Sequence, residues 1–413
     1  MKISERARRV EPFYVMEMGK SASAIAREVA QTGGAPMIYL NMGEPDFTAP
    51  PLVCEAAARA IRDGKTQYTQ STGLDALRER ISHWYATRFG VRVPARRIVI
   101  TAGASAALQL ACLVLLDAGD EVLMPDPCYP CNRQFVSSAD ARAVLIATTP
   151  EARFQLTPEQ VQAAWGSRTR GVLLASPSNP TGTSIHPDAL RRIHAFVRAC
   201  GGVTLVDEIY LGLSHDATYG HSALALDEQI ISINSFSKYF SMTGWRLGWL
   251  VVPDALVSVV EQLAQHLFIC PSTVAQHAAL ACFEPESLAE YEKRRAQFKA
   301  RRDWFVPQLE RLGLRVPVMP DGAFYAWADC GAACQRLFAN RSEYNRGSVG
   351  NTAGDHSAGS WQLALELMRR AHLAVTPGRD FGTAQTERYV RFSTASAMPQ
   401  LQSAVARLAA LLP

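Results

Sequence analysis

Residues 230–252 read IISINSFSKYFSMTGWRLGWLVV. The two apolar runs, Ile230–Asn234 and Gly248–Val252, have the length and composition of buried strands. The segment between them places Lys238 among aromatic and small residues, with no acidic residue nearby in the sequence. Burial in such surroundings lowers the pKa of a lysine and makes a neutral, nucleophilic amine accessible. The alternative is a surface lysine whose apolar stem lies over an aromatic patch.

The sequence around this segment contains more short apolar runs of the same kind. From about Pro51 to Arg294 they alternate with longer amphipathic segments, a pattern typical of an α/β unit with a mostly parallel sheet. We expect further strands at Arg97–Thr101, Glu121–Pro125, Gly171–Ser176 and Val203–Asp207. We expect helices at Ala104–Leu116, His186–Cys200 and Pro253–Leu267.

The C-terminal part indicates a smaller α+β domain. Its expected elements are a long helix at Glu284–Leu312, a turn and strand within Val318–Trp327, a helix at Trp361–Ala371, a strand at Arg388–Ser393 and a last amphipathic helix. Residues 340–360 are rich in Gly, Ser and Asn, which predicts a flexible surface loop. We therefore expect an N-terminal arm with part of the small domain at 1–50, a large domain at 51–294 and the small domain at 295–413.

Length, charge and cysteine usage narrow the class of protein. A chain of 413 residues is long enough for two packed units, and a net charge of +4 without a Lys/Arg run gives no reason to expect nucleic acid or a membrane as partner. The longest apolar stretch, Ala106–Leu116, is too short to span a bilayer. Nine scattered cysteines and a charged N-terminus without a signal-like apolar core favour a reducing compartment, the cytoplasm. Cys128 and Cys131 have metal-site spacing, but no second pair completes a zinc site, so we expect a structural role and no metal.

Two further strand ends carry residues suited to a ligand, which in open α/β sheets binds beyond the carboxyl ends of the strands. The strand ending at Thr101 leads into Gly103, Ala104 and Ser105 before a helix, where free backbone N–H groups can hold a phosphate; a tight turn looks the same. The strand ending near Ser176 leads into a turn in which the amide of Asn179 could meet a ligand oxygen.

Two charged residues extend this pattern. Asp207 follows four apolar strand residues and requires a cationic or hydrogen-bonding partner if it is buried; a helix N-cap is the alternative. Arg246, eight residues after Lys238, offers a guanidinium fork to a phosphate.

These motifs together resemble the class I/II, fold-type I pyridoxal-phosphate-dependent aminotransferases. The resemblance rests on NPTG at 179–182, DEIY at 207–210, SFSK at 235–238 and MTGWRLG at 242–248, and it runs from NMGEPDF at 41–47 to the strand with Arg391. It implies a large domain with a seven-stranded, mostly parallel sheet flanked by helices, a smaller α+β domain, and pyridoxal phosphate (PLP) as cofactor. It also implies ping-pong transfer of the amino group of an L-amino acid to a 2-oxo acid.

The resemblance assigns roles around the cofactor ring. It implies that Lys238 forms the Schiff base and, once displaced, shuttles a proton between Cα and C4′. It implies that Asp207 keeps the pyridine nitrogen protonated, so that the ring can accept the electrons of a carbanion. Asn179 and Tyr210 are implied to hydrogen-bond the ring oxygen O3′, and Tyr129 to stack on the ring.

The resemblance also assigns residues at the two ends of the ligand. The implied phosphate-binding residues are Gly103, Ala104, Ser105, Ser235, Ser237 and Arg246. Tyr68 matches a tyrosine that reaches the phosphate of the neighbouring subunit, which implies a homodimer with shared active sites. Arg391 matches the arginine that binds the substrate α-carboxylate, with Gly43 in the loop beside it. Arg388 lies three residues away, on the opposite face of the strand.

Two departures from the resemblance concern the substrate. Similar aspartate aminotransferases have a lysine where this chain has Ser105, and small hydroxyl residues before the first helix where it has Phe13-Tyr14-Val15. Both changes remove polar contacts for a second carboxylate, so we expect an apolar or aromatic amino donor, alanine included. The alternatives are an aspartate aminotransferase, a β-C–S lyase or related decarboxylase of the same fold, and a cofactor-binding regulator, for which no appended DNA-binding helices are evident. The absence of G-x-G-x-x-G argues against a nucleotide-binding oxidoreductase.

Overall fold

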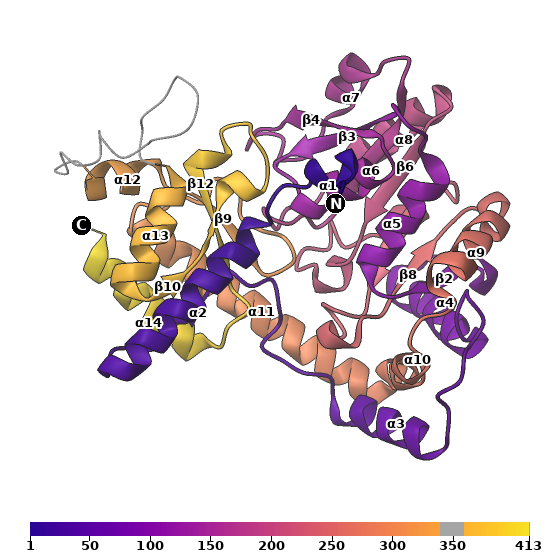
Figure 1. Ribbon diagram of the computed structural model, residues 1–413, viewed down its shortest axis with the longest axis horizontal. Helices are drawn as coiled ribbons and strands as arrows, with labels where there is room; N and C mark the ends of the chain where they lie inside the picture. Colours follow the sequence, from indigo (N-terminus) through magenta and orange to yellow (C-terminus); the bar gives the residue numbers. More distant parts are fainter. Residues whose placement is uncertain (339–358, 413) are drawn as a thin grey trace.

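A seven-stranded sheet forms the centre of the larger part of the computed structural model, which describes residues 1–338 and 359–412 (Figure 1). Its strands are β2 (Ile98–Thr101), β3 (Glu121–Asp126), β4 (Arg142–Ala147), β5 (Thr169–Ala175), β6 (Val203–Asp207), β7 (Ile231–Ser235) and β8 (Gly248–Val251). They are ordered β2-β8-β7-β6-β5-β3-β4, and β8 runs antiparallel to the other six strands. The predicted α/β class with a mostly parallel sheet is confirmed.

Helices cover both faces of this sheet because successive strand side chains alternate between the faces. On β5, Leu173 packs with α5 (Ala104–Leu115), whereas Val172 and Leu174 face a second apolar cluster on the other side. The remaining helices of this part are α3 (Pro51–Arg62), α4 (Asp75–Phe89), α6 (Pro130–Ser138), α7 (Pro158–Ala164), α8 (Pro187–Ala199), α9 (Asp254–Phe268) and α10 (Thr273–Leu280).

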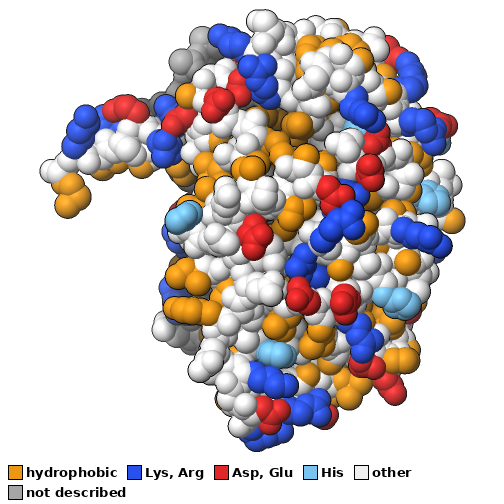
Figure 2. All heavy atoms as spheres, turned by 90° about the vertical axis from the view of Figure 1, so that its right-hand side faces the viewer, with side chains coloured by type: hydrophobic (Ala, Val, Ile, Leu, Met, Phe, Trp, Pro, Cys, Tyr) orange, Lys and Arg blue, Asp and Glu red, His pale blue; other side chains and the backbone are white. Residues whose placement is uncertain are grey.

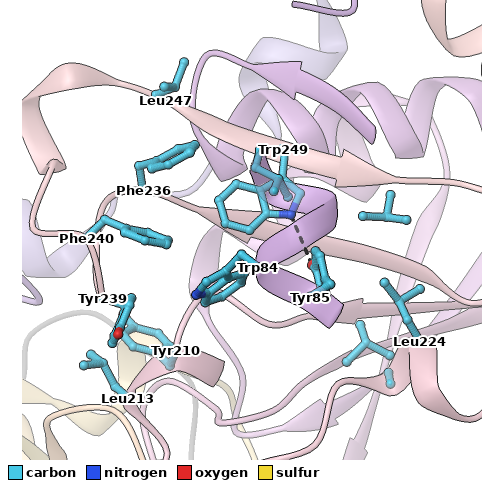
Figure 3. Close-up of a cluster of buried hydrophobic side chains, with 14 of the residues drawn as sticks. Trp84, Tyr85, Tyr210, Leu213, Leu224, Phe236, Tyr239, Phe240, Leu247 and Trp249 are labelled. Carbon is cyan, nitrogen blue, oxygen red and sulfur yellow. Dashed lines mark hydrogen bonds between the residues drawn. The ribbon is translucent and has the colours of Figure 1, made fainter. Parts of the chain in front are cut away.

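The aromatic block that flanks Lys238 in the sequence is buried in the core. Phe236 and Phe240 pack against Trp249 of β8, and the indole N–H of Trp249 donates to the hydroxyl of Tyr85, 3.1 Å away (Figure 3). These large buried rings fix the loop that follows β7. The position of Lys238 is therefore set by packing on both sides of it in the sequence.

A second, smaller core surrounds two short sheets. The antiparallel sheet has the order β11-β12-β9, and a parallel pair joins β1 to β10. The strands are β1 (Ile38–Tyr39), β9 (Tyr325–Asp329), β10 (Leu373–Ala374), β11 (Thr376–Pro377) and β12 (Tyr389–Ser393). The helices are α2 (Tyr14–Thr32), α12 (Gly331–Phe338), α13 (Ser360–Ala371) and α14 (Met398–Leu411). The short α1 (Glu5–Arg8) lies instead on the larger part, where Arg6 and Arg9 pair with Asp140 (Figure 1).

The helix α11 (Pro285–Arg311) connects the two cores (Figure 1). Tyr291 and Phe298 pack in the larger core, and Phe305 and Leu309 pack in the smaller one. The expected boundary at residue 294 falls inside this continuous helix, and the division into domains stays a prediction. The expected loop at 340–360 lies outside the described residues, except for Gly359 and the first residue of α13.

The surface carries mixed charges. On the face shown in Figure 2, basic and acidic side chains are interspersed without a large patch of one sign. Among the described helices, none combines the length and the apolar composition needed to cross a membrane.

Candidate active site

A cavity of about 250 Å³ lies at the carboxyl ends of β5, β6 and β7, where the loop after β1 and strand β12 also reach it. All the site residues predicted from the sequence line this cavity, except Gly103 and Tyr68. They are Gly43, Ala104, Ser105, Tyr129, Asn179, Asp207, Tyr210, Ser235, Ser237, Lys238, Arg246 and Arg391. The structure therefore brings together residues that are as much as 348 positions apart, Gly43 and Arg391 (391 − 43).

Lys238 points into the cavity, and its Nζ donates a hydrogen bond to the carbonyl oxygen of Gly43 at 2.6 Å. Burial, assisted by the positive charges of Arg391 and Arg246, lowers the pKa of Lys238 to about 8, although Glu44 and Asp207 oppose this shift. A lysine with such a pKa is partly neutral near pH 7. The amine can therefore act as a nucleophile or accept a proton.

Asp207 ends β6 with its carboxylate 5% exposed. Its Oδ1 accepts a hydrogen bond from the backbone N–H of Ile209 at 3.1 Å, and no basic side chain among the described residues forms an ion pair with it. The helix N-cap alternative is wrong, because the 3-10 turn that follows is capped by Tyr210. Burial raises the pKa of Asp207 to about 7, although the hydrogen bond from Ile209 and the positive charge of Lys238 each lower it. A buried carboxylate in this position suits a cationic N–H group of a ligand.

We expect Asp207→Asn to change how stability depends on pH in the ligand-free protein. The folded protein holds a proton on Asp207 up to about pH 7, whereas an unfolded aspartate releases it near its ordinary pKa of 3.8. The wild type therefore loses stability as pH rises through this window, by about 1.4 kcal/mol per pH unit for a fully shifted group. In urea unfolding, the free energy of unfolding of the variant minus that of the wild type should grow by roughly 2–4 kcal/mol from pH 4 to 7. Above pH 7 this difference should stay level.

The exposed Asp216 provides the control for this experiment. The backbone N–H of Thr218 lowers the pKa of Asp216, which gives the opposite dependence on pH. Asp216→Asn should therefore lack the growing difference. If the stability difference between Asp207→Asn and the wild type stayed constant or shrank with rising pH, the raised pKa assigned to Asp207 would be wrong.

One end of the cavity is built for an anion. Helix α5 begins at Ala104 without a side-chain cap, so its first backbone N–H groups are available to a ligand. Arg246 lies beside them and donates to the carbonyl oxygen of Thr243 at 2.9 Å. Gly103 has φ +83°, which favours glycine, and a Cβ atom there would lie 2.7 Å from Nη2 of Arg246, so a side chain would push the guanidinium away from this position. No carboxylate among the described residues forms an ion pair with Arg246.

The other end holds the buried cation Arg391, which is 2% exposed. It donates to Oδ1 of Asn179 at 2.8 Å and to the carbonyl oxygen of Asn41 at 2.5 Å, but its Nε has no partner and no carboxylate among the described residues pairs with it. A buried charge without a counter-ion is costly, so this end also calls for an anionic ligand. Arg388 points elsewhere and pairs with Asp329 at 2.7 Å.

Other residues at the site had no assigned role in the sequence interpretation. Tyr325 places its hydroxyl 2.7 Å from that of Tyr210, and its ring lies 4.5 Å below the guanidinium of Arg391. The turn before it was visible in the sequence, but no signal showed that its side chain would face the cavity. Tyr14 and Val15 were expected before the first helix; they are instead the first residues of α2, where their backbone N–H groups donate to Asp380.

Tyr68 lies apart from the cavity with its side chain 80% exposed. Its predicted contact with a neighbouring subunit stays a prediction. The thiols of Cys128 and Cys131 are free, and the described residues contain no group of His, Cys, Asp and Glu that could hold a metal ion.

The residues of the cavity could hold PLP and the carboxylate of an amino acid. Two arginines without counter-ions line the cavity, one beside an uncapped helix N-terminus and one buried. A lysine with a lowered pKa and a carboxylate with a raised pKa line it as well, and the charges of both arginines act on the lysine. A phosphate, an aldehyde carbon, a pyridine nitrogen and a substrate carboxylate each have a chemically matched group.

Comparisons with known proteins agree with this fit. The family model described as aminotransferase class I and II matches residues 35–408. The valine–pyruvate aminotransferase of Mycobacterium tuberculosis is 35% identical, over 98% of this chain and 97% of that protein. An aspartate aminotransferase of Geobacillus stearothermophilus is 32% identical, over 99% of this chain and 98% of that protein. The crystal structure of an aminotransferase from Mycobacterium tuberculosis matches with a TM-score of 0.89 at 34% identity, covering 100% of this chain and 99% of that one.

Proposed function

Since the chain belongs to the class I and II aminotransferases, we propose that it binds PLP in this cavity and transfers the amino group of an apolar or aromatic L-amino acid, alanine included, to a 2-oxo acid. The observation that carries the proposal is that Arg246 and Arg391, both without counter-ions, line one cavity together with Lys238 and Asp207. Because donor and acceptor share the same α-carboxylate, one cavity serves both in turn, as a ping-pong mechanism requires.

The chain's own residues hold the cofactor and move the proton. Bound PLP supplies an electron sink for the carbanion formed at Cα of the amino acid. Asp207 holds a proton on the pyridine nitrogen, and Lys238 is the covalent anchor and then the base at Cα. Asn179 and Tyr210 would bind the ring oxygen, and the ring of Tyr129 would contact the cofactor ring. The phosphate is held by the backbone at Gly103, Ala104 and Ser105 and by Ser235, Ser237 and Arg246.

The donor preference follows from the remaining walls of the cavity. Lys238, Arg246 and Arg391 are the basic residues among those that line it, and each already has a role. Apolar side chains from the segment around α2 and from the loop after β1 form another part of the wall: Phe13, Val15, Met16 and Met42. A second carboxylate against this wall would be desolvated without a cation, whereas an apolar side chain gains contact. The similar valine–pyruvate aminotransferase is named for an apolar donor.

An absorbance scan of the PLP-loaded protein with single amino acids tests the proposal. Valine, alanine or phenylalanine should bleach the cofactor band as pyridoxamine phosphate forms, at least about tenfold faster than aspartate at equal concentration. A 2-oxo acid should then restore the band. Aspartate as the fastest donor would favour an aspartate aminotransferase instead. Pyruvate and ammonia released from cystathionine without an acceptor would favour a β-C–S lyase.

We also propose that two copies share their active sites through Tyr68. Its ring is exposed and lies in a segment held by the hydrogen bond from Thr273 to the carbonyl oxygen of Gln67, at 2.6 Å. An exposed aromatic side chain on an ordered segment suits an interface. In the proposed dimer its hydroxyl would complete the phosphate site of the second subunit.

A further inference from the structure

The hydroxyl groups of Tyr210 and Tyr325 form a buried hydrogen-bonded pair at the wall of the cavity, with a distance of 2.7 Å between the oxygens. Tyr210 follows strand β6 of the large sheet, and Tyr325 begins strand β9 of the three-stranded sheet. Burial raises the pKa of both residues, so both hydroxyls stay protonated near neutral pH. One of the two therefore donates to the other.

Tyr325 also contacts two other parts of the site. Its ring lies 4.5 Å from the guanidinium carbon of Arg391. A Cβ atom on Gly43 would lie 2.2 Å from the Tyr325 hydroxyl oxygen, so the Gly43 loop, whose carbonyl accepts from Lys238, rests directly against this hydroxyl. Tyr325 thus joins the residues around the cofactor to those around the substrate carboxylate.

The direction of the hydrogen bond follows from the number of protons. A tyrosine hydroxyl has one proton to donate. If Tyr210 donates its proton to a ligand oxygen, its own oxygen can still accept, and Tyr325 is its hydrogen-bonding partner in the structure. Donation by Tyr325 would then hold the Tyr210 hydroxyl in place and polarise it, because consecutive hydrogen bonds strengthen one another.

We propose that Tyr325 is a positioning residue, which orients the Tyr210 hydroxyl toward the ring oxygen of PLP by donating its own proton to Tyr210. The inference rests on the proposed function, since it requires PLP in this cavity with its ring oxygen at Tyr210. In this proposal Tyr325 does not bind the cofactor itself; it acts by orienting the hydroxyl of Tyr210.

The pH titration of the bound cofactor's absorbance tests this role in the PLP-loaded protein. A donor at the ring oxygen stabilises its negative charge and lowers the midpoint of the titration. Tyr210→Phe should raise the midpoint by about one pH unit, and Tyr325→Phe by about half a unit, roughly a threefold change in the proton equilibrium. The charged groups around the cofactor stay the same in both variants: Glu44, Asp207, Arg246 and Arg391. We expect kcat to fall by about three- to tenfold in Tyr325→Phe, with KM changed by less than about twofold, because its ring still lies below Arg391.

The double variant separates positioning from a general structural effect. If Tyr325 acts through Tyr210, the midpoint in Tyr210→Phe/Tyr325→Phe equals that in Tyr210→Phe alone, whereas additive shifts would overturn the inference. The matched control is Tyr389→Phe on strand β12, whose ring stacks on Trp327 at 5.2 Å; it should leave the midpoint unchanged. If the midpoint shifts in Tyr210→Phe but not in Tyr325→Phe, the role of Tyr325 is overturned and the proposed placement of the ring oxygen stands. No shift in Tyr210→Phe overturns the proposed placement of the ring oxygen as well.

Discussion

Replacing Lys238 by alanine should reduce transamination by at least about 10⁴-fold, because one substitution removes both the proposed covalent anchor and the proposed base at Cα. The structure gives the amine no substitute. The cavity is lined by two other basic residues, Arg246 and Arg391, and a guanidinium stays protonated and cannot serve as a base. Single-turnover absorbance measurements with the best donor would give the rate.

Two further measurements make this result specific. After borohydride reduction, the wild type should gain the mass of one cofactor on the peptide that contains Lys238, and the variant should not. A small primary amine in the buffer should restore part of the rate, because it can accept the proton where Nζ is missing. Lys293→Ala on helix α11 is the control, since this lysine is exposed and pairs with Glu290. Normal turnover in Lys238→Ala would refute the proposed mechanism.

The strands of the large sheet could be predicted from the sequence where they are buried. Strand β6 has the predicted bounds, Val203–Asp207, because a fully buried strand is a short, continuous apolar run. Strand β4 (Arg142–Ala147) was not predicted. It lies at the edge of the sheet, pairs only with β3 among the described strands and is partly exposed, although five of the six residues in its sequence, RAVLIA, are apolar.

The candidate site could be predicted in part by the same argument. Asn179, Asp207 and Lys238 each follow a parallel strand, and the carboxyl ends of such strands meet at one edge of the sheet. Arg391 and Gly43 were expected at the site only through the family resemblance, because they belong to the smaller part of the molecule. No local pattern indicates how the smaller part, with strands β9, β11 and β12, packs against the larger part. The inward direction of Tyr325 depends on that packing.

Replacing Arg391 should weaken the productive binding of every amino acid while leaving PLP in place. We expect kcat/KM to fall by about 10³-fold in Arg391→Ala, since a buried, hydrogen-bonded charge pair is lost, and by about 10²-fold in Arg391→Lys, which keeps the charge but lacks the bidentate fork. The cofactor band should be retained, because in the proposed site Arg246 and helix α5, and not Arg391, would hold the phosphate. Steady-state kinetics and cofactor absorbance measure the two effects separately.

A structural role for Arg391 would give different results. Arg391 is buried without a counter-ion in the ligand-free protein, so its removal should not lower the melting temperature despite the lost hydrogen bonds to Asn41 and Asn179. An amine substrate without a carboxylate should react equally with the wild type and Arg391→Ala, because it has no group for the guanidinium to bind. Arg388→Ala is the matched control, as Arg388 lies three residues earlier and pairs with Asp329 outside the cavity. If Arg388→Ala caused the larger loss, or if Arg391→Ala lost PLP but bound amino acids normally, the assignment of the carboxylate end would be wrong.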